Sequence, residues 1–69
     1  MTENLDSTDW AILKELQKDG RLTITELSRR ISLGSSATAE RVRRLEQTDV
    51  IVGYHAKVDL SKVGLPVLA

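Results

Sequence analysis

The sequence contains no cysteine and has only one histidine, one tryptophan and one tyrosine among its 69 residues. The lack of cysteine excludes disulfides and thiolate metal sites and fits a reducing compartment, so we expect a cytoplasmic protein. With one histidine there is no Ser–His–acid or metal-ligand constellation, so we expect neither an enzyme nor a bound cofactor. No apolar run approaches the roughly 20 residues needed to span a bilayer. The polar, acidic residues 1–6 are unlike a signal peptide, and no membrane association is expected.

The length and the charge distribution narrow the possible partners. A chain this short forms one small domain and buries only about 60% of its unfolded surface, so a partner subunit or a second domain is expected. The formal net charge is zero. However, residues 1–20 carry two lysines against five carboxylates, a net charge of −3, whereas residues 21–69 carry eight lysines and arginines against five carboxylates, a net charge of +3. A basic half of this kind can bind phosphates while the acidic half faces away.

Hydrophobic periodicity predicts a first helix over about residues 7–19. Asp6 or Ser7 can act as its N-cap, and Gly20 is expected to end it as a left-handed C-cap. Trp10 lies beside the apolar stripe and is expected to pack, either on this core or on a partner. The stripe itself consists of Leu5, Ile12, Leu13 and Leu16.

Two further short helices, joined by a tight turn, are predicted over about residues 24–31 and 35–48. Thr23 and Glu26 have the spacing of a capping box, and the turn falls at Ser32-Leu33-Gly34. At 100° per residue, a third helix with Val42 facing inward turns a mostly polar face outward: Ser36, Ala37, Glu40, Arg43, Arg44 and Gln47, with Arg41 on the flank. Two compact helices with an arginine-bearing second member have the geometry that places a helix in the major groove of DNA.

After the third helix the period changes to two. Apolar Val52, Tyr54, Ala56, Val58 and Leu60 alternate with polar residues or glycine, which predicts a β-strand with one apolar face. A lone strand leaves backbone groups unpaired, so it should pair with residues 21–22 or with its own copy in a second subunit, and we favour the second.

These patterns divide the chain into three parts. We expect residues 1–49 to form a DNA-binding domain of helix-turn-helix type and residues 50–63 to form a linker β-strand. Residues 64–69 contain Gly64-Leu65-Pro66, which breaks the strand, and then an apolar segment that we expect to begin a further α/β domain. The predicted fold class is mainly α: a three-helix, winged-helix-like helix-turn-helix domain followed by a C-terminal linker β-strand.

The ordered set of short motifs resembles the opening of the Lrp/AsnC family of bacterial and archaeal regulators. The likeness covers essentially the whole chain, and its specificity comes from the order and spacing of the motifs. It departs from the family where Ser32, Gly34 and Asp49 replace the usual Gly, Ser and Gly. The matching motifs are Leu5-Asp6 with Asp9, Ile12-Leu13, residues 16–21, Glu26-Leu27-Ser28, residues 40–46, Ile51, Gly53-Tyr54, Ala56, Leu60 and residues 63–66.

The resemblance implies a sequence-specific transcriptional regulator whose third helix enters the major groove of double-stranded DNA. It implies a homodimer or a higher homo-oligomer paired through the linker strand, and an amino-acid effector bound by the following α/β domain. By this analogy the residues nearest the DNA are Ser35, Ser36, Ala37, Glu40, Arg41, Arg43 and Arg44.

Two other functions remain open on the sequence alone. Siroheme decarboxylases share a similar first half with these regulators, although they typically have a longer connection before the second helix and an Arg-Arg-Ile-Gly-Ala type stretch where this chain has residues 51–56. Their existence means that the fold does not exclude catalysis. His55 lies on the polar side of the predicted strand, where solvent exposure is the expected role. A helix-turn-helix used only for protein contacts is the third hypothesis, with Trp10 and the apolar strand face as its surfaces.

Overall fold

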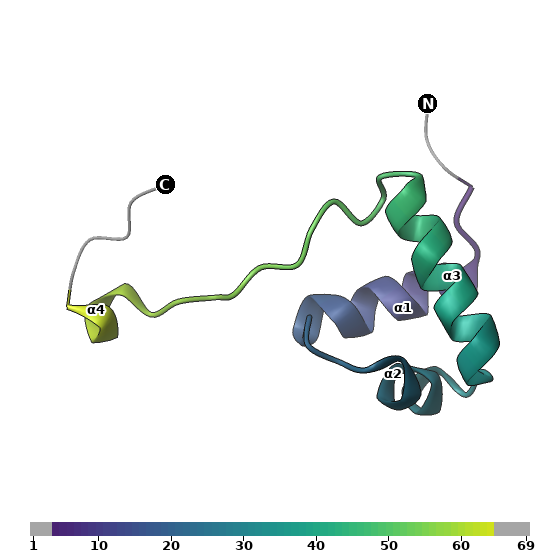
Figure 1. Cartoon of the computed structure of the whole chain (residues 1–69), viewed down its shortest axis with the longest axis horizontal. Coiled ribbons are helices and arrows are strands. Elements are labelled where there is room, and N and C mark those ends of the chain that lie inside the picture. The colour runs from purple at the N-terminus through teal and green to yellow at the C-terminus, as the bar shows by residue number, and fades with distance from the viewer. Residues whose placement is uncertain (1–3, 65–69) are drawn as a thin grey trace.

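The computed structural model describes residues 4–64. In chain order the helices are α1 (Ser7–Lys18), α2 (Ile24–Ile31), α3 (Ser35–Gln47) and the short α4 (Leu60–Val63). The first three pack together as a bundle, and an extended segment leads away from it to α4 (Figure 1). The three helices predicted from the sequence are confirmed to within one or two residues at each end.

Local hydrogen bonds define where α1 begins and ends. Asp6 is the N-cap: its carboxylate accepts from the Asp9 amide at 2.9 Å, and the Asp9 carboxylate accepts from the Asp6 amide at 3.3 Å. At the other end the predicted left-handed conformation of Gly20 is wrong. The C-cap is Asp19 in an extended conformation, and its side chain accepts from the Arg21 amide at 2.9 Å. This bond turns the chain without a positive φ at the glycine.

The turn between α2 and α3 is built from left-handed and extended residues. Thr23 caps α2 by accepting from the Glu26 amide at 3.1 Å, which is half of the predicted capping box. The Glu26 carboxylate pairs with arginines of its own helix instead. Ser32 ends α2 with a φ of 57°, and Gly34 is the N-cap of α3. The serine therefore adopts the conformation for which a glycine is usually selected.

The core lies where the three helices meet. Its buried apolar side chains are Ile12 from α1, Leu27 from α2, and Val42 and Leu45 from α3. Burying each of these contributes roughly 1.5–3 kcal/mol relative to exposure, so every helix depends on the other two. Thr38 of α3 is also fully buried, and its hydroxyl donates to the Gly34 carbonyl at 2.9 Å. Partly buried residues surround this centre: Leu5, Leu13, Leu16, Leu22, Ile24, Ile31, Val50 and Ile51.

The predicted linker strand takes a different form. Residues 60–63 are helical rather than extended, because Asp59 caps the Ser61 amide at 3.0 Å and Gly64 closes the turn with a φ of 70°. Residues 52–59 form neither a helix nor a paired strand. They pair neither with Arg21-Leu22 nor with any other described segment. A strand exists only with a neighbour to bond, so pairing with a second copy stays a prediction. The segment expected to open an α/β domain lies at 65–69, outside the described residues.

Candidate nucleic-acid interface

The outward face of α3 is the face predicted from the helical projection. Thr38, Val42 and Leu45 point into the core, which leaves the opposite side of the helix to solvent. The side chains near its N-terminus are short and those further along are long and cationic, an order that suits a helix whose first turns approach base edges. The exposed residues on this side are Ser36, Ala37, Glu40, Arg43, Arg44 and Gln47, and Ser35 is exposed as the first residue of the helix.

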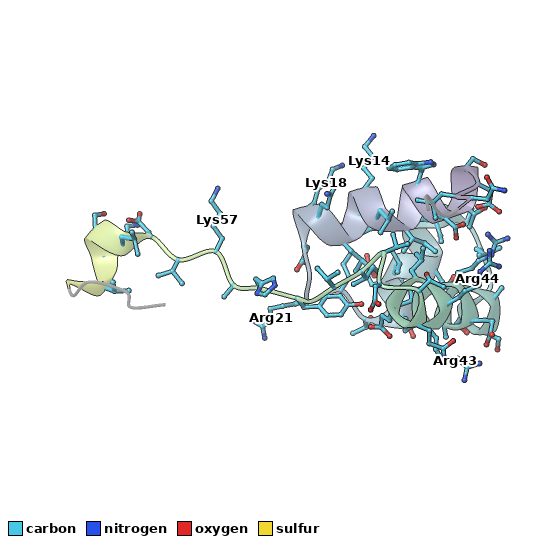
Figure 2. The ribbon with its side chains drawn as sticks, turned by 90° about the horizontal axis from the view of Figure 1, so that it is seen from above. Lys14, Lys18, Arg21, Arg43, Arg44 and Lys57 are labelled. Carbon is cyan, nitrogen blue, oxygen red and sulfur yellow. The ribbon has the colours of Figure 1, made fainter. Side chains whose placement is uncertain are left out.

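Arg43 and Arg44 project from α3 in different directions (Figure 2). Arg43 forms an exposed ion pair with Glu40 one turn earlier. Such a pair is worth little in water, so it can be exchanged for a phosphate or a base. Arg44 makes no ion pair with any carboxylate of residues 4–64. Among the α3 arginines, its guanidinium is therefore the one that has no carboxylate of the described residues to leave before it binds an external anion.

The N-terminal end of α3 is electrostatically suited to an anion. Gly34 offers no side chain to cap the helix, and the first turn contains no acidic residue. The first backbone amides of a helix lack partners within the helix, and the helix dipole adds positive potential there. A phosphate next to Ser35 and Ser36 would find both backbone donors and hydroxyls.

Arg41 has a different environment from the other two arginines. Its Nη1 donates to Asp6 Oδ2 at 2.6 Å and to Asp9 Oδ1 at 3.3 Å, and only 33% of its side chain is exposed. These hydrogen bonds, above all the one with Asp6, raise the pKa of Arg41. The hydrogen bond from Arg41 in turn lowers the pKa of Asp6 below its ordinary value. The family resemblance places Arg41 among the DNA-facing residues, whereas in the structure its guanidinium is turned towards α1.

The remaining cations are distributed around the bundle. Arg30 bridges Glu15 of α1, at 3.3 Å, and Glu26 of its own helix, at 3.5 Å. Lys14 and Lys18 project from α1 on the side away from α3 (Figure 2). The Glu26–Arg30 spacing of four residues is visible in the sequence, whereas the tie between Glu15 and Arg30 needed the tertiary structure.

Sequence reasoning missed a contact between the linker and α3. The Tyr54 hydroxyl donates to Glu46 Oε2 at 2.8 Å. Partial burial of the ring, followed by the hydrogen bond to Glu46 and the charge of that carboxylate, raises the pKa of Tyr54 to about 12. The ring lies beside Gly20, between α1 and α2, with its Cδ1 3.8 Å from the position that a Cβ would take at that glycine. Tyr54 thus joins the linker to the C-terminal end of α3 and to the α1–α2 connection.

Other kinds of site find little support in residues 4–64. No cluster of three His, Asp or Glu side chains that could hold a metal ion occurs there. Among the same residues, no helix is long and apolar enough to cross a membrane. His55 is exposed on the linker, as expected. Trp10 is 61% exposed, so of its two predicted packing roles only the one against a partner remains.

Comparison with known proteins agrees with this geometry. A family model described as winged helix-turn-helix DNA-binding matches residues 5–52. The chain is 46% identical over 65 residues to the uncharacterized HTH-type transcriptional regulator YezC of Bacillus subtilis, covering 94% of this chain and 47% of that protein. It is 48% identical over 63 residues to the HTH-type transcriptional regulator LrpC of the same organism, covering 91% and 44%.

Solved structures show the same relationship in three dimensions. The structure of B. subtilis LrpC superimposes with a TM-score of 0.86 at 45% identity, covering 93% of this chain and 46% of that one. The transcriptional regulator NMB0573 from Neisseria meningitidis, solved with L-Met, superimposes with a TM-score of 0.84 at 40% identity, covering 87% and 39%. The chain spans about half the length of the curated relatives it matches. With its fold, its α3 surface and these similarities in agreement, the chain belongs to the winged helix-turn-helix DNA-binding family and, within it, to the Lrp-type regulators.

Proposed function

We propose that this chain is the DNA-binding part of a cytoplasmic transcriptional regulator that places α3 in the major groove of double-stranded DNA. The supporting observation is the outward face of α3, with short side chains at its N-terminal end and two exposed arginines further along, held on a three-helix core. Ser35, Ser36, Ala37 and Glu40 would approach base edges, and Arg44 would contact a base or a phosphate. Arg43 would bind the backbone after leaving Glu40.

We further propose that the protein binds as a homodimer or a higher homo-oligomer. Val52, Tyr54 and Val58 are about half exposed or more, and the segment that carries them has unpaired backbone in a single chain. Pairing of residues 50–59 with the same segment of a second copy would cover this surface. Two α3 helices would then lie in successive major grooves, about one helical turn (~34 Å) apart.

We also propose that the whole regulator, of which this chain is a part, binds an amino acid as its effector. This proposal rests on the L-Met complex of the Neisseria meningitidis relative, which this chain matches over only 39% of that relative's length. Titration of the full-length regulator with L-methionine and other amino acids by calorimetry tests it, and absence of heat with every one of them would contradict it. We propose action by DNA binding rather than by catalysis, in line with the names of the relatives.

A binding titration against salt tests the central proposal. Duplexes selected by the full chain from a random-sequence library, long enough for two half-sites, would be titrated at several salt concentrations. The logarithm of the affinity should fall linearly with the logarithm of the salt concentration. Arg44→Gln should weaken binding by about 1–3 kcal/mol if Arg44 reads a base, or reduce the salt slope by about 1 if it contacts a phosphate.

Lys14→Gln provides the matched control. It removes the same charge from an exposed side chain on the side of α1 away from α3 (Figure 2), and it should leave both affinity and slope nearly unchanged. An affinity indifferent to salt, or equal losses in the two variants, would contradict the proposal. Dimerisation without binding to any duplex would favour a helix-turn-helix used for protein contacts, for which the exposed Trp10 is a candidate surface.

A further inference from the structure

A three-residue charge cluster joins the start of α1 to the middle of α3. One guanidinium nitrogen of Arg41 lies 2.6 Å from Asp6 Oδ2 and 3.3 Å from Asp9 Oδ1, across 35 and 32 positions of sequence. The two carboxylates are already oriented, because each accepts the backbone amide of the other in the capping box of α1. Arg41 therefore binds two carboxylates whose positions are fixed by the N-terminus of α1.

The charge cluster neutralises the buried Asp9 carboxylate and orients α3 on α1, neither of which the apolar core can do. Asp9 is only 3% exposed, and a buried carboxylate is costly without a hydrogen-bonded countercharge. Arg41 supplies that countercharge from the adjacent turn of α3. The apolar contacts of Ile12 with its neighbours hold the helices together but are non-directional. Charge-assisted hydrogen bonds are directional, so the cluster restricts the angle at which α3 crosses α1.

Arg41 also occupies an intermediate position on α3. It follows the exposed Glu40, precedes the buried Val42, and lies three residues before Arg44. A guanidinium that leaves the two aspartates to reach a phosphate would leave the Asp9 carboxylate buried without its counterion. Contact with DNA at this residue would thus weaken the scaffold that presents the rest of the helix.

We infer that Arg41 is a positioning residue: it holds α3 at its angle on α1 through Asp6 and Asp9, and it does not contact DNA. The inference rests on the proposed function, because it explains how the DNA-facing side of α3 is oriented. Arg41 thus has a different role from Arg43 and Arg44, although all three belong to one run in the sequence.

The substitution Asp6→Asn distinguishes the two roles of Arg41 by the sign of its effect. Asparagine is as good an N-cap as aspartate, so the cap of α1 is kept while the charge facing Arg41 is removed. If Arg41 were a phosphate ligand, removing the competing carboxylate would tighten DNA binding. If Arg41 is a positioning residue, affinity should instead fall by about two- to fivefold, because the lost Arg41–Asp6 pair is partly exposed and screened by solvent.

Two controls accompany this measurement on the full chain with the selected duplexes. Asp19→Asn removes one negative charge at the far end of α1, where no ion pair with Asp19 occurs among residues 4–64. It should leave affinity unchanged or slightly raised. Arg41→Gln should lower affinity while the salt slope stays at the wild-type value, since each lost phosphate contact would reduce it by about 0.9. Tighter binding by Asp6→Asn, or a reduced slope in Arg41→Gln, would overturn the inference.

A measurement without DNA separates this inference from the proposed function. Residual dipolar couplings of backbone amides in α1 and α3 report the angle between the two helices in the free protein. In Asp6→Asn, with helical content confirmed by circular dichroism, the α1–α3 angle should change or its couplings should be averaged, while those within each helix stay the same. An unchanged angle would overturn the inference even if the wild type binds DNA as proposed. Absence of wild-type DNA binding would refute the proposed function alone.

Discussion

The hydrogen bond between Tyr54 and Glu46 leads to a prediction that can be measured without knowing any DNA target. Tyr54 is the only tyrosine of the chain, so its ionisation can be followed directly by the ultraviolet absorbance of tyrosinate. In the folded protein the pKa of Tyr54 is raised from 10.0 to about 12, first by partial burial and then by the hydrogen bond and charge of Glu46. We expect the titration midpoint of the native protein to lie well above that of the urea-unfolded chain.

The free energy that this contact contributes follows from the shift and the exposure. Two pKa units in a buried group would correspond to about 2.7 kcal/mol. Tyr54 is 48% exposed, so solvent screening limits the contribution to about 1 kcal/mol or less. Because the folded pKa lies above the unfolded value, the stabilisation is fully present below pH 10. It is lost as the pH rises from about 10 to about 12.

Two variants define the result that would refute this reasoning. Glu46→Gln removes the charge but keeps an acceptor, so the Tyr54 midpoint should move down towards 10.0, the ordinary value. Tyr54→Phe should abolish the tyrosinate signal and lower the free energy of unfolding by about 0.5–1 kcal/mol, the lower part of the range for one hydrogen bond because the ring is about half exposed. Circular dichroism at each pH would establish that the helices are intact where the midpoint is read. Equal midpoints for the wild type and Glu46→Gln would show that the charge of Glu46 does not raise the pKa of Tyr54.

The other predictions concern the scaffold that carries α3. Leu27→Ala empties a fully buried site and should cost about 2.7–5 kcal/mol, which for a domain of this size lowers the melting temperature by roughly 10–40 °C. The same substitution at Leu60, 61% exposed in α4, should stay within about 0.5 kcal/mol, and equal effects in urea unfolding would contradict the assigned core. Ser32→Gly relieves a φ of 57° and should stabilise the fold by up to about 1 kcal/mol. A lower urea midpoint would show that Ser32 is not strained.

The sequence predicted the helices well because each one is specified by nearby residues. The N-caps Asp6 and Thr23 and the apolar period of α1 are signals within a few positions of the elements they define. Ser32 and Asp49 adopt left-handed conformations. They stand at two of the positions where the Lrp/AsnC family usually has glycine. The outward face of α3 was predictable for the same reason, since helical periodicity alone separates Val42 from Arg44.

Two expectations failed where local signals compete with each other or with other segments. Gly20 was expected to end α1, but the side chain of Asp19 bonds the Arg21 amide and makes a left-handed glycine unnecessary. The alternating pattern after α3 predicted a strand up to residue 63, but Asp59 and Gly64 cap a helical turn over its last residues. Whether residues 52–59 pair depends on a second chain, because strand hydrogen bonds join different segments.

The amino-acid sequence by itself determined the three helices, the turn between α2 and α3, and the polar side of α3, because hydrogen bonds and periodicity within one helix act over three or four residues. Only the tertiary structure decided which partners the three arginines in the 41–44 run have. Arg41 meets Asp6 and Asp9 from more than 30 positions away, Arg43 meets a neighbour on its own helix, and Arg44 faces solvent. The same holds for Tyr54 and Glu46, since the path of the linker brings them together. Spacing along the chain specifies which side of a helix a residue occupies, but packing determines which residues of other segments lie against that side.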